Sequence, residues 1–268
     1  MSFSQSSPWG EPTIADLIGR RALTAIFQPI VDFDGGAILG YEGLIRGPAG
    51  SPLDTPGALF ERASHEGQSD APEHAAARAC VTAFTELGCE GKLFLNFSAD
   101  ALVALGPTHD STVDWLKRQG LGVDRLVLEL TEQSTIADVR SFAPAIAALR
   151  ATGVGFALDD YGTANASMNL WVRLQPDVVK IDRFFIDDIA NDPLKFEAVR
   201  AMQHFAQASG ARLVAEGIEN AADLIVVRDM GIALGQGFLI GRPDPRAARK
   251  LAEPAREALG AGHIAVFP

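Results

Sequence analysis

TAIFQPIVDFDGGAILGYEGLIR, residues 24–46, decides how the fold begins, because two β-rich runs here flank a short turn segment. The first run is Thr24–Asp32 and the second is Ala37–Arg46. The Asp-Gly-Gly sequence at residues 34–36 supplies the turn chemistry between them. We therefore predict that the two runs pair as an antiparallel hairpin.

After this hairpin, β-branched or Leu-rich runs alternate with Ala-rich stretches of helical period. Six further strands are predicted, at Lys92–Phe97, Arg125–Thr131, Val154–Asp160, Asp177–Asp182, Ala211–Gly217 and Ile232–Phe238. Helices are predicted at Pro56–Glu66, Glu73–Leu87, Ser111–Gln119, Ile136–Ala151, Ala166–Arg173, Pro193–Ala208, Glu219–Met230 and Pro245–Leu259. Strands alternating with helices predict the α/β class and a (β/α)₈ barrel, in which the hairpin makes one strand pair antiparallel. An open doubly wound sheet is the alternative.

The 268 residues include 34 Asp and Glu against 23 Lys and Arg, which gives a formal net charge of −11 at pH 7. A DNA- or RNA-binding protein needs a basic surface to displace counterions, so a nucleic-acid polymer is excluded as a partner. An anionic membrane surface would also repel the chain. Apolar residues make up 47% of the chain, which is enough for a large core. We expect a flexible N-terminal lead at residues 1–21 and one barrel domain over residues 22–268, including the C-terminal helix and tail.

The N-terminal segment has neither the basic start nor the apolar core of a signal peptide. No apolar run approaches the roughly 18 residues that a membrane helix needs. Cys80 and Cys89 are the two cysteines, and no histidine lies near them at ligand spacing, so neither a disulfide framework nor a zinc site is indicated. We therefore expect a cytoplasmic location.

Charged and amide side chains interrupt the apolar runs in the C-terminal parts of the predicted strands. They are Glu42, Asn96, Glu129, Asp159, Asp160, Lys180, Glu216 and Gln236. A barrel brings these positions together in one ring. Burying a single carboxylate in an apolar strand costs several kcal/mol unless a cation compensates it, and here five carboxylates face one lysine. Divalent metal is the simplest compensation.

Every candidate metal ligand is an oxygen atom, because the five histidines lie away from the predicted strand ends. Oxygen ligands favour Mg²⁺ or Mn²⁺ over zinc or copper. At a strand end, the adjacent Asp159 and Asp160 can both turn toward one site, where Asp159 can bridge two ions. Two metal ions roughly 3.5–4 Å apart form the clamp that is used for in-line displacement at phosphorus.

Each of these residues also has an ordinary structural explanation. A glutamate in a strand usually faces solvent. Asp159 and Asp160 fit a helix cap followed by a turn, and Asn96 fits the start of a helix. Lys180 fits an exposed ion pair with Asp182. The joint pattern favours one shared site, because separate coincidences at the same end of seven strands are much less expected than a single cause.

Eight runs around these residues follow the order of a known family pattern. They are Phe27–Val31, Gly40–Arg46, Leu95–Ser98, Glu129–Glu132, Leu158–Thr163, Val179–Arg183, Ala215–Glu219 and Gln236–Phe238. Together they resemble the EAL-domain cyclic di-GMP phosphodiesterases, and the resemblance extends over about residues 22–245. It implies a modified TIM barrel whose first strand is antiparallel to the others, which agrees with the predicted hairpin.

The resemblance also implies a role for each matching residue. The residues implied to hold the first metal ion are Glu42, Asn96, Glu129 and Asp159, and those for the second are Asp159 and Asp160. The implied catalytic set is Glu42 and Asp159 together with Lys180 and Glu216, which position and help activate the attacking water. The implied substrate-binding residues are Gln28 and Arg46, for the guanine and phosphate ends, with Glu219 and Gln236. Glu132 is implied to steady the loop after Asp160.

Two positions depart from the family pattern. The triplet that names the family reads Glu-Gly-Leu at residues 42–44, which keeps the metal ligand. The loop at Tyr161–Ser167 lacks a glycine and an aromatic residue of the usual pattern. In the family this loop shapes the second metal position and contacts the other subunit.

The resemblance implies a metal-dependent hydrolase of bacterial second-messenger signalling, which opens cyclic di-GMP to linear pGpG with a water activated by two Mg²⁺ or Mn²⁺ ions. It also implies a homodimer. Because the N-terminal lead is short, we expect any regulatory protein to act in trans. The alternative function is a cyclic di-GMP receptor with little or no catalysis. A third hypothesis is an unrelated barrel enzyme of the enolase type, with acidic strand ends around Mg²⁺.

Overall fold

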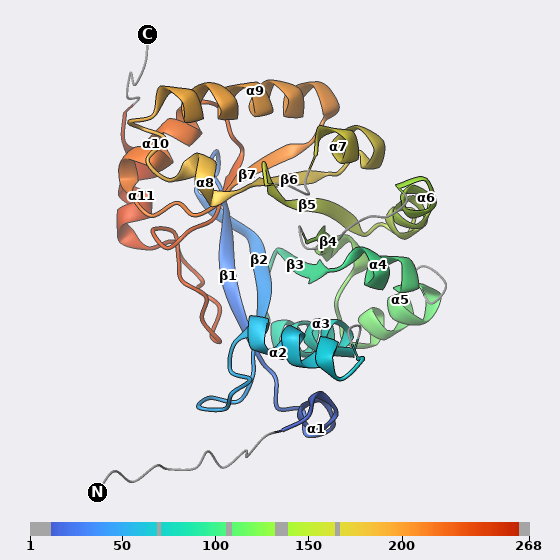
Figure 1. The fold of residues 1–268 in the computed structure, drawn as a ribbon. Helices are drawn as coiled ribbons and strands as arrows, with labels where there is room; N and C mark the ends of the chain where they lie inside the picture. Colours follow the sequence, from blue (N-terminus) through green and yellow to red (C-terminus); the bar gives the residue numbers. More distant parts are fainter. Residues whose placement is uncertain (1–11, 69–70, 106–108, 132–138, 164–166, 263–268) are drawn as a thin grey trace, which may run out of the picture.

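The computed structural model describes residues 12–68, 71–105, 109–131, 139–163 and 167–262. Its eight strands close into a barrel in the order of the sequence (Figure 1). They are β1 (Thr24–Asp32), β2 (Ala37–Arg46), β3 (Lys92–Phe97), β4 (Leu126–Leu130), β5 (Gly155–Tyr161), β6 (Val178–Ile181), β7 (Arg212–Ala215) and β8 (Leu234–Gly235). The predicted α/β barrel is confirmed, and closure excludes the open doubly wound sheet.

The first strand runs against both of its neighbours. β1 pairs antiparallel with β2 and with β8, whereas the other neighbouring pairs are parallel. The short turn between β1 and β2 explains this direction, because a tight turn can join only antiparallel strands. The register places Gln28 of β1 opposite Glu42 of β2. The hairpin prediction is therefore confirmed.

Helices surround the barrel. They are α1 (Ile14–Gly19), α2 (Pro56–His65), α3 (Ala71–Glu86), α4 (Ala99–Leu105), α5 (His109–Arg118), α6 (Val139–Arg150), α7 (Met168–Leu174), α8 (Arg183–Ile186), α9 (Pro193–Ser209), α10 (Ala221–Asp229) and α11 (Glu253–Gly260), with a 3₁₀ turn, η2 (Val123–Arg125). Capping side chains fix several starts; Asp192, for example, accepts hydrogen bonds from the backbone N–H groups of Leu194 and Lys195. Among the described residues, no helix combines the length and apolar character needed to cross a bilayer.

Two apolar clusters form the core, a large one between strands and helices and a smaller one inside the barrel. The inner apolar cluster consists of Ile30, Phe94, Val127, Ala157, Val178, Val214 and Leu234. Side chains two positions apart on a strand point to the same face. Two positions from each member toward one end of the barrel lies a polar residue, at positions 28, 96, 129, 159, 180, 216 and 236. The barrel interior is therefore built in two layers, one apolar and one polar.

Three short helices are absent from the sequence-based expectation, namely α1, α4 and α8. Each is too short to show a helical period, and capping side chains fix the starts of α1 and α8. Thr13 and Asp16 form a capping box for α1, and Asp182 accepts a hydrogen bond at 2.9 Å from the backbone N–H of Phe184 in α8. Residues 14–19, expected within the flexible lead, form a helix that buries Ile14 and Leu17.

The helix predicted at Pro245–Leu259 is wrong in its first half, because α11 begins only at Glu253. The preceding segment is irregular, with a turn at residues 245–246 and a φ of +50° at Ala247, and contacts with the barrel hold it in place. Asp244 and Phe27 exchange two backbone hydrogen bonds, and the hydroxyl of Tyr41 donates to the backbone oxygen of Ala248 at 2.8 Å. These tertiary contacts override the helical propensity of the Ala-rich sequence.

Candidate active site

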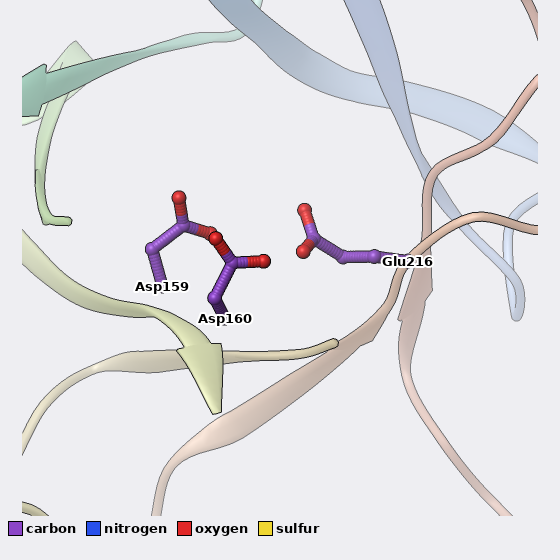
Figure 2. Close-up of side chains that lie close together, drawn as sticks. All are labelled: Asp159, Asp160 and Glu216. Atoms are coloured by element: carbon purple, nitrogen blue, oxygen red, sulfur yellow. The ribbon is translucent and has the colours of Figure 1, made fainter. Parts of the chain in front are cut away.

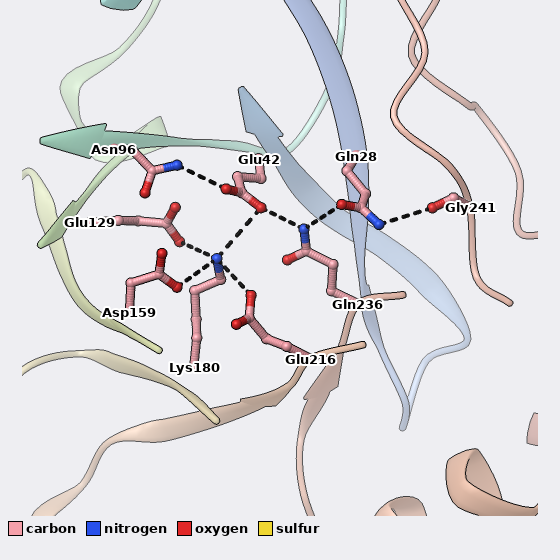
Figure 3. Close-up of polar contacts among 9 residues, drawn as sticks. All are labelled: Gln28, Glu42, Asn96, Glu129, Asp159, Lys180, Glu216, Gln236 and Gly241. Carbon is pink, nitrogen blue, oxygen red and sulfur yellow. Dashed lines mark hydrogen bonds and ion pairs between the residues drawn. The ribbon is translucent and has the colours of Figure 1, made fainter. Parts of the chain in front are cut away.

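Polar side chains from every strand of the barrel meet at one end of it (Figure 3). We call this set the polar ring; its members are Gln28, Glu42, Asn96, Glu129, Asp159, Lys180, Glu216 and Gln236. Glu216 directly follows β7 and Gln236 directly follows β8, because those strands are shorter than predicted. The structure therefore brings together the strand-end residues that the sequence analysis selected.

Lys180 lies at the centre of the polar ring, with its side chain only 1% exposed. Its Nζ atom lies 2.8 Å from Glu216 Oε1, 2.9 Å from Asp159 Oδ1, 3.3 Å from Glu129 Oε1 and 3.5 Å from Glu42 Oε2 (Figure 3). The ordinary explanation of Lys180 as an exposed ion pair with Asp182 is thus wrong. One buried ammonium group faces four carboxylates.

Amide groups hold the carboxylate of Glu42 from two sides. Asn96 Nδ2 donates to Glu42 Oε1 at 2.8 Å, and Gln236 Nε2 donates to Glu42 Oε2 at 2.6 Å. Gln236 Nε2 also lies 3.1 Å from its acceptor Gln28 Oε1, and Gln28 Nε2 donates to the backbone oxygen of Gly241 at 3.2 Å (Figure 3). The carboxylate is therefore fixed in orientation, while the amide oxygens of Asn96 and Gln236 accept no hydrogen bond from another described residue.

Asp159, Asp160 and Glu216 form a second acidic group at the edge of the ring. One carboxylate oxygen from each lies within 4.8 Å of the others (Figure 2). Consecutive strand residues usually point to opposite faces. Here Asp160 has a φ of +48°, and the β5–β6 register shifts between Leu158 and Tyr161. This irregularity turns both aspartates toward one space, as the sequence analysis expected, although it lies within β5 rather than beyond its end.

Burial disfavours ionisation of three carboxyl groups in the ring. It raises the pKa of Glu129 and of Glu216 well above the ordinary value, against the opposing charge of Lys180. It also raises the pKa of Asp159. The neighbouring carboxylates add to the effect, because like charges repel at these distances.

Glu42 and Lys180 are shifted toward their charged forms. Burial alone would raise the pKa of Glu42, but Lys180 and the hydrogen bonds from Gln236 and Asn96 together hold it below the ordinary value. Burial alone would lower the pKa of Lys180, but the surrounding carboxylates raise it well above the ordinary value. Lys180 is therefore a cation at neutral pH, yet it is a single positive charge among an excess of acids.

Within the described ranges of the chain, the ring also holds buried oxygen atoms that accept no hydrogen bond. They are Asn96 Oδ1, Glu129 Oε1 and Oε2, Asp159 Oδ1 and Gln236 Oε1, of which the Glu129 Oε1 and Asp159 Oδ1 atoms face Lys180 as ion pairs. Such buried acceptors are costly to leave unsatisfied. Carboxylate and amide oxygens are the ligands that Mg²⁺ and Mn²⁺ prefer. The donor set therefore fits hard divalent cations.

A cleft of about 930 Å³ leads away from the ring. Asn96, Asp159 and Asp160 line it, as do Phe60 and Glu61 of α2. Ligand sites in proteins are typically clefts of about 300–1,000 Å³. The cleft is therefore large enough for a small-molecule ligand, and its lining includes the acidic residues Asp159 and Asp160.

Two of the expected substrate-binding residues lie at the rim rather than in the ring. Arg46 lies four residues beyond Glu42 on β2, and its Nη1 donates to the backbone oxygen of Ile45 at 2.8 Å. Glu219 pairs with Arg183 at 3.0 Å, and both side chains are exposed. Glu132, expected to steady the loop after Asp160, lies outside the described residues.

Arg183 is a rim residue that the sequence analysis did not select. Its side-chain stem packs on Gly217, where a Cβ atom would lie 2.3 Å from Arg183 Cγ and where φ is +68°. Gly217 directly follows Glu216, so Arg183 bridges the ends of β6 and β7 beside the ring. A search for charged residues one or two positions beyond each strand end would have found it.

The EAL domain family model matches residues 13–243. Among curated relatives, the bifunctional diguanylate cyclase/cyclic di-GMP phosphodiesterase MucR of Pseudomonas aeruginosa is 32% identical over 231 residues, which are 84% of this chain and 34% of that protein. An uncharacterized protein of Azorhizobium caulinodans is 31% identical over 250 residues, which are 88% of this chain and 33% of that protein. The chain thus spans about a third of the length of these relatives.

Solved structures share the barrel. A PaMucR phosphodiesterase in complex with c-di-GMP superposes with a TM-score of 0.73 at 31% identity, covering 85% of this chain and 94% of that one. Klebsiella pneumoniae BlrP1 in a manganese/cy-diGMP complex gives a TM-score of 0.75 at 26% identity, covering 83% of this chain and 56% of that one.

Proposed function

Because this chain belongs to the EAL-domain family, we propose that it is a metal-dependent phosphodiesterase that hydrolyses cyclic di-GMP to linear pGpG. The observation that carries the proposal is the polar ring itself. Four carboxylates surround buried Lys180, and acceptor oxygens of Asn96 and Glu129 have no hydrogen bond. A receptor that only binds a nucleotide has no need for such an excess of buried acids.

Two divalent cations, Mg²⁺ or Mn²⁺, are proposed to be held by these oxygens. The first would be held by Glu42, Asn96, Glu129 and Asp159, and the second by Asp159 and Asp160. When bound, such ions polarise phosphoryl oxygens and lower the pKa of the attacking water. The relative with bound manganese supports this choice of cation class.

Lys180 and Glu216 are the proposed partners of the attacking water. Lys180 Nζ lies 2.8 Å from Glu216 Oε1, and its three N–H donors are charged at neutral pH. Lys180 therefore donates hydrogen bonds that orient the water oxygen and Glu216 together. One carboxylate oxygen of Glu216 lies within 4.8 Å of an oxygen of Asp159 and of Asp160 (Figure 2), so Glu216, once bound cations favour its ionised form, would be placed to accept a proton from the water.

The cleft supports a dinucleotide as the substrate. One phosphate would lie at the acidic end of the cleft, beside Asp159 and Asp160, and the remainder would extend toward α2. Gln28 and Gln236, which hydrogen-bond to each other in the ring, are proposed to exchange these bonds for a guanine edge, and Arg46 is proposed for a phosphate. Glu219 is proposed as a further polar contact at the rim.

We also propose a homodimer in the cytoplasm. Apolar side chains are exposed on neighbouring helices of one part of the barrel wall, at Met168 and Val172 of α7, Phe184 of α8 and Leu194 of α9, with 45%, 56%, 65% and 80% of each exposed. Surface of this kind supports a subunit contact. The unpaired thiols of Cys80 and Cys89 support a reducing compartment. A regulatory protein partner in trans remains a proposal.

The direct test is incubation of the purified protein with cyclic di-GMP, with and without Mg²⁺, followed by chromatography of the nucleotides. We expect pGpG to form with Mg²⁺ and to disappear when EDTA is added. Tight binding of cyclic di-GMP without pGpG would instead identify a receptor. The absence of both cyclic di-GMP binding and pGpG formation would refute the cyclic di-GMP assignment.

A further inference from the structure

An apolar cavity of about 250 Å³ lies outside the barrel, on the side where Figure 1 shows α3, α4 and α5. Its walls come from β3 and β4 on one side and from α3, α5 and α6 on the other, and include Val81, Leu126, Leu128 and Leu149. An aliphatic cavity of about 150 Å³ is known to stay dry and to bind benzene. This cavity is therefore large and apolar enough for an alkyl chain of several carbon atoms.

Two nitrogen-bearing side chains of α3 line one edge of this cavity. His74 and Arg78 are one helical turn apart, so they lie on the same face of α3. Arg78 is exposed, and its guanidinium lies 4.8 Å from the centroid of the Trp115 ring. Arg150 and Arg212, by comparison, pair with carboxylates at 2.5 and 2.6 Å.

Within the described part of the chain, Arg78 has the ring of Trp115 as its contact and no carboxylate partner. The chain has an excess of acidic residues, with a net charge of −11, yet none of the described ones pairs with Arg78. The Arg78 guanidinium is therefore available to an anionic ligand. Its place at the edge of an apolar cavity selects a ligand with an apolar body and an anionic end.

The cavity and the substrate cleft share a wall. Ala77, Leu95 and Phe97 line both of them. Leu95 and Phe97 flank Asn96, whose side chain points the opposite way, into the barrel, and donates to Glu42 at 2.8 Å. A ligand that fills the cavity therefore contacts the strand that positions Asn96 of the polar ring.

We propose that this cavity binds a medium-length unbranched carboxylate, with its alkyl chain between β3, β4 and α5 and its carboxylate at Arg78. Through the shared wall, occupancy changes the efficiency of the polar ring toward its substrate. The binding step is independent of the proposed phosphodiesterase activity, and only the coupling rests on it.

Calorimetric titration of the full chain with sodium octanoate, without nucleotide, tests the binding step. We expect saturable binding that is about tenfold weaker in Arg78→Ala, the loss typical of one charge-assisted hydrogen bond. Arg118→Ala is the matched control, since Arg118 is an exposed arginine of α5 that does not line the cavity. Octan-1-ol, with the same chain and no charge, should bind wild type and Arg78→Ala equally.

Val113 offers a second variant, because it lines the cavity from α5. Val113→Phe should fill the space and abolish octanoate binding, and circular dichroism checks that the barrel is retained. Failure of the wild type to bind octanoate would overturn the proposal. Equal octanoate binding by wild type and Arg78→Ala would overturn the assignment of the carboxylate to Arg78.

Steady-state formation of pGpG at saturating octanoate tests the coupling. We expect kcat/KM to change by about fivefold or more in the wild type, the scale of typical coupling between sites, and to stay constant in Val113→Phe. Acetate at the same concentration controls for binding of the cation by carboxylate. An unchanged kcat/KM with octanoate bound overturns the coupling, whereas absence of pGpG without octanoate refutes the proposed function and leaves the binding test standing.

Discussion

The inner apolar cluster and the polar ring occupy the same strands of the barrel, two residues apart. Phe94 and Asn96 share β3, and Val127 and Glu129 share β4, so these strands contribute to both layers, whereas β2 contributes Glu42 to the ring and no member of the inner apolar cluster. The apolar layer has every side chain buried at 7% exposure or less and needs no partner beyond its neighbours. The polar layer is nearly as buried, with Glu129 at 0%, yet it carries unsatisfied oxygens and an excess of acids.

This difference indicates that the apolar layer stabilises the fold, whereas the polar layer provides the site. Burial of apolar surface stabilises the first layer, by about 25 cal/mol for each Å² removed from water. The same burial destabilises the second layer, because it raises the pKa of Glu129, Asp159 and Glu216. The barrel closes in spite of the ring, and the ring is consistent with a structure adapted to bound cations.

Removing the largest side chain of the apolar layer should produce the largest loss of stability. Phe94 is fully buried, so Phe94→Ala leaves a cavity in the barrel and is expected to lower the free energy of unfolding by about 3–5 kcal/mol. Urea denaturation followed by circular dichroism measures this. A loss below about 1 kcal/mol would mean that the inner cluster does not hold the barrel together.

Removing a carboxylate of the polar layer should act on turnover instead. Glu42→Ala is expected to reduce pGpG formation more than about a hundredfold and to retain the circular dichroism spectrum. Even substitution of a residue that only hydrogen-bonds to a metal ligand can reduce activity by up to about a hundredfold. Glu197→Ala is the control, since Glu197 is an exposed acid of α9 paired with Arg200. Wild-type turnover in purified Glu42→Ala contradicts the assignment of the ring.

The pH dependence of stability should distinguish the layers without mutation. Glu129, Asp159 and Glu216 have raised pKa values, so in this window the folded chain binds more protons than the unfolded chain. The free energy of unfolding contributed by these groups therefore falls as pH rises from about 4 through their raised values. Glu42, with its lowered pKa, contributes in the opposite direction and is outnumbered.

Denaturation curves of EDTA-treated protein across this pH range measure the slope. Saturating Mn²⁺ should flatten it, since a bound cation favours the ionised carboxylates. A metal-free chain whose stability rises steadily with pH above 5 would contradict the pKa directions given for the ring.

The rim should give the smallest effect. Arg183 and Glu219 form an exposed pair, and pairs of this kind contribute about 0–1 kcal/mol. Arg183→Ala is expected to lower kcat/KM for cyclic di-GMP by at most about fivefold, with the melting temperature unchanged. A hundredfold loss would place Arg183 among the residues that contact the reacting phosphate.

The sequence predicted the barrel and most of the ring, because a polar residue two positions beyond an apolar one breaks a strand pattern visibly, as at Val127 and Glu129. It did not predict the central position of Lys180, which depends on the distances between five strands. It also missed the positive φ of Asp160, since no local pattern marks a register shift.

The remaining misses have different physical causes. The segment after Asp244 is Ala-rich, yet backbone pairing of Asp244 with Phe27 keeps it from forming a helix, and such tertiary contacts leave no local signal. Helix α8 is only four residues long and begins at the capping side chain of Asp182, which gives no period to read. Glu132 lies outside the described residues, so its role stays a prediction.

Glu129→Gln tests most directly whether the polar layer is a metal site set into an otherwise stable barrel. The free energy of unfolding is measured for wild type and variant, each with EDTA and with Mn²⁺. We expect the variant to be at least as stable as wild type in EDTA, because it replaces a buried acid of raised pKa with a neutral side chain of the same shape. Mn²⁺ should stabilise the wild type by about 2.7 kcal/mol at a hundred times its dissociation constant and the variant far less. The account is contradicted if Glu129→Gln destabilises the EDTA-treated protein as much as Phe94→Ala, or if Mn²⁺ stabilises both proteins equally.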